Sequence, residues 1–166
     1  RAHFQPFIDR ALSKVIMGRV TAVDDKQLHR VILRAWEDWV PRSYLKDGIW
    51  EKSYSAGLDI LTLYRKGKKC AIIEFLTNAQ NVKSSQGGDL DWAIFDEEPE
   101  QAKYKETLMR FGTALDLDIE IDWTPTEGLT WATGLFHQGV DNEEIKASGA
   151  EPTLFKLTTV CNRFVN

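Results

Sequence analysis

The sequence is poor in several features, and each shortage narrows the kind of protein it can encode. Its 166 residues include only two cysteines, Cys70 and Cys161, with no second Cys or His at metal-ligand spacing, so we expect reduced, buried thiols. No apolar run approaches the roughly 20 residues that cross a bilayer, and no secretory signal opens the chain. The net charge of −4 gives no global basic footprint of a nucleic-acid-binding module. We expect an intracellular globular protein.

What the sequence does contain is an ordinary globular composition, 43% apolar and 28% charged, in a length that fits one domain over residues 1–166. Apolar spacing and turn signals predict these elements: a helix from Pro6 whose apolar stripe reaches Ile16, a strand over 18–23, a helix over 24–40, paired strands over 58–64 and 69–76, a strand over 90–95, a helix over 99–112 with Pro99 in its first turn, a strand over 117–123, a short helix within 124–139, and a strand over 153–165. Asp24 or Asp25 would cap the second helix and Pro41 would end it. Strands alternating with helices predict an α/β domain with a largely parallel sheet.

Three acids, Asp96, Glu97 and Glu98, follow the apolar stretch "WAIF" where a buried strand should end. In open α/β sheets ligands bind beyond the carboxyl ends of the strands. Adjacent carboxylates repel one another, and a cation such as Mg²⁺ relieves that repulsion. An apolar strand ending in Asp-Glu has the general form of a Walker B segment, in which Asp96 would hold Mg²⁺ and Glu97 would polarise the attacking water. The alternative is that the acids only favour the N-terminus of the next helix.

A second candidate follows the predicted strand over 117–123, in the stretch "TPTEGLTW". It contains Thr124, Pro125, Gly128 and Trp131, and could be an ordinary turn, with proline fixing φ and glycine permitting an unusual backbone. If its strand adjoins the acidic one, the Thr124 hydroxyl would stand near the attacking water or the γ-phosphate.

Taken together and in order, these segments resemble the ATPase domain of viral terminase large subunits, the motors that package DNA into procapsids. The similar segments are "GRVTAVDDKQLHRVILRAWEDWVPRSYL", the hairpin "GLDILTLYRKGKKCAIIEFLT", the Walker B region "SSQGGDLDWAIFDEEP", the helix "ETLMRFG" and the coupling motif "TPTEGLTW". The resemblance covers residues 18–165.

The resemblance implies a three-layer, P-loop NTPase-like α/β domain with a β-hairpin, using ATP and Mg²⁺ to drive double-stranded DNA into a procapsid. Gln86 and Gly87 would shape the loop beside the nucleotide, and the coupling motif would pass on the γ-phosphate state. Lys83 and Arg110 are candidates for a cation supplied to a neighbouring subunit, against the alternative of solvated surface charge. The implied partners are double-stranded DNA, the portal protein, the small terminase subunit and further copies in a homo-oligomeric ring, in the host cytoplasm and not at a membrane.

The sequence departs from this family at its phosphate-binding loop. No G-x-x-x-x-G-K-[ST] occurs, because Gly67-Lys68 is followed by Lys69 in a predicted hairpin turn. The family's nuclease acids do not follow the last predicted strand either. We therefore expect the C-terminal portion of a terminase-like ATPase domain, without its N-terminal P-loop segment and inactive in isolation.

Two other functions stay open at this point. One is a metal-dependent nuclease that would use Asp89, Asp91, Asp96 and Glu97. The other is a non-catalytic remnant that acts as an interaction module. The basic cluster Arg65, Lys66, Lys68 and Lys69 could meet DNA phosphates or form a solvated turn.

Overall fold

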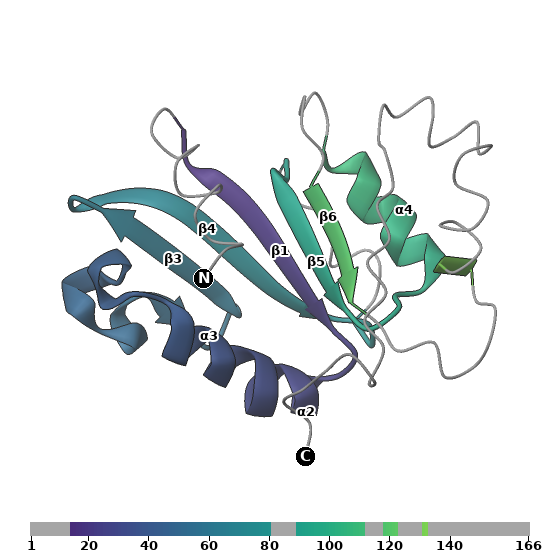
Figure 1. Ribbon diagram of the computed structural model, residues 1–166, viewed down its shortest axis with the longest axis horizontal. Helices are drawn as coiled ribbons and strands as arrows, with labels where there is room; N and C mark the ends of the chain where they lie inside the picture. The colour runs from purple at the N-terminus through teal and green to yellow at the C-terminus, as the bar shows by residue number, and fades with distance from the viewer. Residues whose placement is uncertain (1–13, 81–88, 112–117, 123–130, 133–166) are drawn as a thin grey trace, which may run out of the picture. The chain divides into compact units, whose positions relative to one another are not determined.

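The computed structural model describes residues 14–80, 89–111, 118–122 and 131–132 (Figure 1). The chain divides into two compact units, Arg1–Thr124 and Pro125–Asn166. In the second unit the described residues are Trp131 and Ala132, which are helical. No helix among the described residues is long and apolar enough to cross a membrane. All that follows on the fold concerns the first unit.

Six described strands of this unit form one sheet in the order β2-β3-β4-β1-β5-β6. Their bounds are β1 Ile16–Ala22, β2 Tyr54–Ser55, β3 Ile60–Arg65, β4 Lys68–Thr77, β5 Trp92–Asp96 and β6 Asp118–Asp122. Strand β1 is parallel to both β4 and β5, and β5 is parallel to β6. The antiparallel pairs are β2 with β3 and β3 with β4. The predicted α/β class with a largely parallel sheet is confirmed.

The predicted hairpin is confirmed as β3 and β4, which are joined by Lys66 and Gly67. Both turn residues have positive φ, 51° and 76°. Two consecutive positive φ values match the twist of hairpin strands, and glycine adopts them without steric cost. The turn therefore places the basic cluster at the amino end of β4.

The predicted helix over 24–40 is one helical run made of α2 Asp25–Gln27, a π-helical turn Leu28–Ile32 and α3 Leu33–Trp39. Asp24 is its N-cap, since its carboxylate accepts a 2.7 Å hydrogen bond from the N–H of Gln27. Val40, with ψ of 119°, leaves the helical region before Pro41, as residues preceding proline tend to do. Three short 3₁₀ turns, Arg42–Tyr44, Lys46–Gly48 and Trp50–Lys52, lead to β2.

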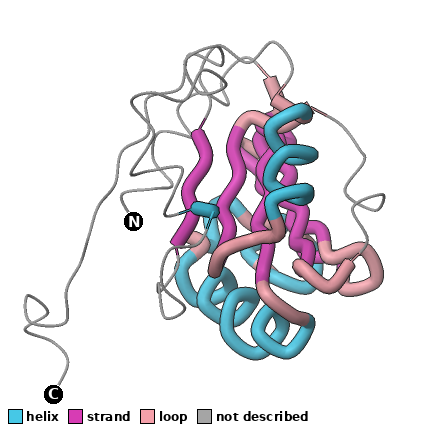
Figure 2. The backbone as a smooth tube through the Cα atoms, turned by 90° about the vertical axis from the view of Figure 1, so that its right-hand side faces the viewer, coloured by secondary structure: helices cyan, strands magenta, loops and turns pink. Residues whose placement is uncertain are grey.

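Helices lie on both faces of the sheet (Figures 1 and 2). The α2–α3 run packs on the face that carries Ile16, Val20 and Phe75. The helix α4, Gln101–Met109, lies on the opposite face, where Ala93 and Phe95 are buried beside Tyr104. Side chains along β5 thus alternate between two cores, as expected of a strand covered on both sides.

The close approach of Trp92 to β1 explains Gly18. A Cβ atom built at Gly18 would lie 2.1 Å from ring atoms of Trp92, far inside contact distance. The indole of Trp92 stacks on that of Trp36, with ring centroids 6.2 Å apart and planes 6° apart. Glycine at this position lets the indole lie directly on the strand and join β5 to the α3 layer.

Most predicted boundaries differ from the observed ones by one to three residues; the strands predicted over 58–64 and 90–95, for example, begin at Ile60 and Trp92. Two further differences concern Ile16 and Pro99. Ile16 begins β1 instead of continuing a helix, because pairing with Ala71 of β4 outweighs the local helical spacing. Pro99 precedes α4, whose N-cap is Glu100, instead of lying in its first turn. Several predicted features lie outside the described residues: the helix before residue 14, the loop over 81–88, most of 124–139 and the strand over 153–165.

Candidate functional site

The strands β4, β1, β5 and β6 all end at the same edge of the sheet, and the arrowheads of β1, β5 and β6 meet there in Figure 1. Ala22 pairs with Thr77 at this carboxyl edge, and Asp96 pairs with Asp122. Open α/β sheets bind ligands at such an edge. The acids singled out by the sequence therefore lie where a ligand would be held.

Asp96 is the last residue of β5 and is half-buried. Burial raises the pKa of its carboxyl above the ordinary value of 3.8, and the carboxylates of Asp122 and Glu97 raise it further. Its side chain makes no hydrogen bond or ion pair with the described part of the chain. A cation bound here would offset both the burial and the repulsion.

Glu97 has φ of 80°, in the left-handed region that favours glycine. For a residue with a side chain this conformation costs about 1–2 kcal/mol. The conformation is fixed by a 2.6 Å hydrogen bond from the Glu97 N–H to the carbonyl of Asp122. Backbone strain of this kind gathers at functional sites, where neighbouring structure holds it in place.

The helix-capping explanation for the acids does not fit the start of α4. Its N-cap is Glu100, which makes no side-chain cap hydrogen bond, and no acid stands in the first turn. The buried Pro99 separates the Asp96–Glu98 segment from the helix. Asp96 and Glu97 are therefore not needed to begin α4.

Two residues at this edge were missed by the sequence reasoning. Asp122 ends β6, and its direct pairing with Asp96 could have been found from the alternation in "IEID" once β5 and β6 were placed side by side. Lys103 of α4 is 3% exposed, and its ammonium donates to three backbone carbonyls at the end of β4 and in the turn after it. Nothing in the sequence distinguishes it from a surface lysine.

The four acids of the nuclease hypothesis do not come together. Asp91 precedes β5 and Asp96 ends it, so about five strand residues, roughly 16 Å, separate them. Asp91 also accepts a 2.9 Å hydrogen bond from the N–H of Met17 and pairs with Lys14. Among the described residues no three His, Cys, Asp or Glu side chains group as metal ligands. A single metal cannot join these acids.

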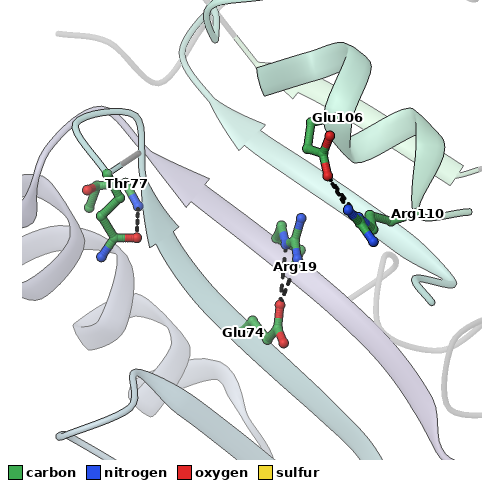
Figure 3. A network of polar contacts seen from close by, with 6 residues as sticks. Arg19, Glu74, Thr77, Glu106 and Arg110 are labelled. Atoms are coloured by element: carbon green, nitrogen blue, oxygen red, sulfur yellow. Dashed lines mark hydrogen bonds and ion pairs between the residues drawn. The ribbon is translucent and has the colours of Figure 1, made fainter. Parts of the chain in front are cut away.

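The other predicted site residues are dispersed. Arg110 is the C-cap of α4, and its guanidinium pairs with Glu106 (Figure 3). Its backbone carbonyl accepts a 2.8 Å hydrogen bond from the N–H of Leu90, near the amino end of β5. In its own chain it therefore lies at the opposite edge of the sheet from Glu97, and its role toward a neighbouring subunit stays a prediction. Trp131 is half-buried in the second unit. Outside the described residues lie Lys83, Gln86, Gly87, Thr124, Pro125 and Gly128.

No family model and no curated protein matches the chain. A solved structure does match: the large terminase of a thermophilic bacteriophage in complex with ADP, with a TM-score of 0.59 at 16% identity. The chain is similar in fold to a phage large terminase. The match covers 81% of this chain and 32% of that terminase. The matched part of this chain therefore corresponds to about a third of the terminase's length. At this identity the likeness establishes the fold, and it agrees with the P-loop NTPase-like class expected from the sequence.

Proposed function

We propose that this chain is part of the ATPase motor of a terminase large subunit, which powers the packaging of double-stranded DNA into viral procapsids. The observation that carries the proposal is Glu97: a glutamate held in a strained backbone conformation at the carboxyl end of a buried parallel strand, directly after a half-buried aspartate. The likeness to an ADP-bound terminase supports the same interpretation.

The residues at this edge fit a magnesium ion. Mg²⁺ in nucleotide sites is bound by one or two carboxylates, with water and phosphate oxygens completing its shell. Asp96 supplies such a carboxylate, without a competing partner in the described chain and with its pKa raised by burial and by Asp122 and Glu97. When bound, the ion would neutralise charge on the phosphate oxygens.

Glu97 would accept a hydrogen bond from the attacking water and orient it toward the γ-phosphate. The bond between its N–H and the Asp122 carbonyl fixes the backbone from which that side chain projects. Thr124 and Pro125 follow β6 by two and three residues, and we assign them, with Gly128 and Trp131, the coupling of the phosphate state to the motor. Gln86, Gly87 and a cation from Lys83 or Arg110 of a neighbouring subunit would complete the site.

The proposed partners follow from this motor: double-stranded DNA, the portal protein, the small terminase subunit and further copies in a ring, in the host cytoplasm. No G-x-x-x-x-G-K-[ST] phosphate-binding loop occurs in the 166 residues, so this chain by itself should not turn over ATP.

The test is ATP turnover by the complete protein encoded by the gene, with Glu97→Gln as the variant. Losing one transition-state contact of this kind costs about 10²–10³-fold in rate, while nucleotide binding should persist. Glu51→Gln, at an exposed acid of a 3₁₀ turn, is the matched control. Unchanged turnover in Glu97→Gln would defeat the assignment, and DNA cleavage with Mn²⁺ and no nucleotide would favour the nuclease instead.

A further inference from the structure

Lys103 is a buried lysine in the first turn of α4, 3% exposed. Its ammonium donates to the carbonyls of Thr77, Asn78 and Gln80, the last two at 3.0 and 2.9 Å. An ammonium has three protons to donate, so these bonds use all of them. A charge this far from water is tolerated only with such partners.

The three carbonyls come from Thr77, the last residue of β4, and from Asn78 and Gln80 in the turn that follows it. The N–H of Asn78 donates to Ala22 at the end of β1, at 2.7 Å, and the N–H of Gln80 donates to Thr77 at 3.2 Å. The side-chain oxygen of Gln80 accepts a 3.4 Å hydrogen bond from the N–H of Thr77. Among the described residues the buried Thr77 hydroxyl has no hydrogen-bond partner. The contacts of Lys103 with this segment are made to backbone carbonyls.

Lys103 also lies six residues after Glu97 in the chain. The segment between them is pinned at its start, where the Glu97 N–H bonds to Asp122, and passes through the fully buried Pro99. At its end Lys103 ties α4 to the turn after β4, two strands away from β5 in the sheet. The bend that carries Glu97 is thus anchored at both ends.

We propose that Lys103 is a positioning residue for Glu97: by holding the start of α4 against the turn after β4, it keeps the Asp96–Glu97 bend in its strained conformation at the carboxyl edge. The effect of Lys103 on catalysis rests on the proposed function. Its effect on the conformation of the Asp96–Glu97 bend can be measured without any enzymatic activity. Burial lowers the pKa of the Lys103 ammonium; Glu100 opposes this shift and the positive charge of Arg19 adds to it. The three carbonyls accept the protons of the ammonium.

A purely structural lysine would behave differently from a positioning one. Losing a structural lysine would loosen the whole unit, so that β1 and the Glu97 bend open together. Losing a positioning lysine would release the bend while β1, at the centre of the sheet, stays closed. Local opening of this kind is visible in amide hydrogen exchange.

The experiment compares Lys103→Met with Lys105→Met in the complete protein. Lys105 is two residues further along α4 and exposed, so its variant loses the same charge from the surface. Hydrogen exchange is followed by mass spectrometry in peptides covering 93–99 and 16–22. We expect exchange in the first peptide to rise about tenfold in Lys103→Met with the second unchanged, and neither to change in Lys105→Met. Equal acceleration in both peptides, or none in 93–99, would overturn the proposal.

Kinetics supply the second readout. Lys103→Met should lower kcat for ATP and leave KM within about twofold, because the residue places Glu97 and does not bind nucleotide. Should Lys103→Met fail to fold, Gln80→Ala decides, since it loosens the carbonyl turn with Lys103 intact: faster exchange in 93–99 supports the proposal and unchanged exchange overturns it. If Glu97→Gln leaves turnover unchanged, the proposed function fails. The hydrogen-exchange result would still decide whether Lys103 holds the Glu97 bend, because it does not depend on turnover.

Discussion

The two edges of the sheet treat their charged groups in opposite ways. At the amino edge, Asp91 accepts the N–H of Met17 and pairs with Lys14, and Arg110 pairs with Glu106 across one turn of α4. These contacts connect α4, β5 and β1 at one end. Each of these charges has a partner within the chain.

At the carboxyl edge, two carboxylates lack such partners in the described chain. Asp96 is half-buried beside Asp122, and Glu97 is held in a left-handed conformation. The buried cation nearby, Lys103, donates its three protons to carbonyls and neutralises neither acid. Here the fold maintains repulsion and strain that it could have avoided.

The difference between the two edges separates acids that stabilise the fold from acids that remain available to bind a ligand. Charges paired within the chain contribute to folding, and replacing them costs stability. Charges left buried and repelled reduce stability, and evolution tolerates that cost where a ligand or a reaction requires it. One acid of each kind lies at the two ends of β5: Asp91 directly precedes the strand and Asp96 is its last residue.

The largest expected change in stability comes from Asp91, and it distinguishes this acid from Asp96. Asp91→Ala removes a charged hydrogen-bond acceptor from the N–H of Met17, so the free energy of unfolding should fall by about 1–3 kcal/mol. Urea unfolding of the complete protein measures the change. ATP turnover should stay within about twofold, because Asp91 stands at the edge opposite the proposed site.

Asp96→Ala is the counterpart at the carboxyl edge, and the pattern should invert. Turnover should be lost, and stability should change by less than about 1 kcal/mol, because a repelled carboxylate is removed. If both variants lose stability equally and keep their activity, the contrast between the edges is wrong.

The outline of this fold followed from its sequence because most elements carry strong local signals. The hairpin has alternating strands around Lys66-Gly67, and the helix after Asp24 has an aspartate cap and a terminal proline. Ile16 shows where this fails: its spacing is helical, yet pairing with Ala71 places it in the central strand. Parallel pairing between distant segments leaves no local trace in the sequence.

The same limit applies to the candidate site. Asp96 and Glu97 could be located because they end an apolar run, and strand ends can be read from composition. The positive φ of Glu97, its bond to Asp122 and the burial of Lys103 all depend on which segments become neighbours. In the sequence, the residues around Glu97, Asp122 and Lys103 are those found around ordinary surface residues.

A smaller effect tests the strain at Glu97 itself. Glu97→Gly removes the side chain and permits φ of 80° without steric cost, whereas Glu97→Ala removes the same carboxylate and keeps the strain. We expect the glycine variant to be more stable than the alanine variant by about 1 kcal/mol, less than the full steric cost because glycine also adds freedom to the unfolded chain. Chemical unfolding of the two variants gives the difference, and an alanine variant of equal or greater stability would mean that the bend is unstrained.

The smallest effect concerns the pH dependence of Asp96. Because the folded state raises the pKa of this carboxyl above 3.8, folded protein binds its proton more tightly than unfolded protein does. The free energy of unfolding should therefore fall as pH rises from 3.8 through the raised value, by less than about 1 kcal/mol, since water screens a half-exposed group. Asp96→Asn cannot ionise and should lack this decline, so its stability relative to wild type should increase between about pH 3.5 and pH 7. Asp122→Asn, which removes one of the repelling charges, should move the decline toward lower pH. Parallel stability curves for wild type and Asp96→Asn would show that the carboxyl edge carries no such repulsion and that the two ends of β5 are alike.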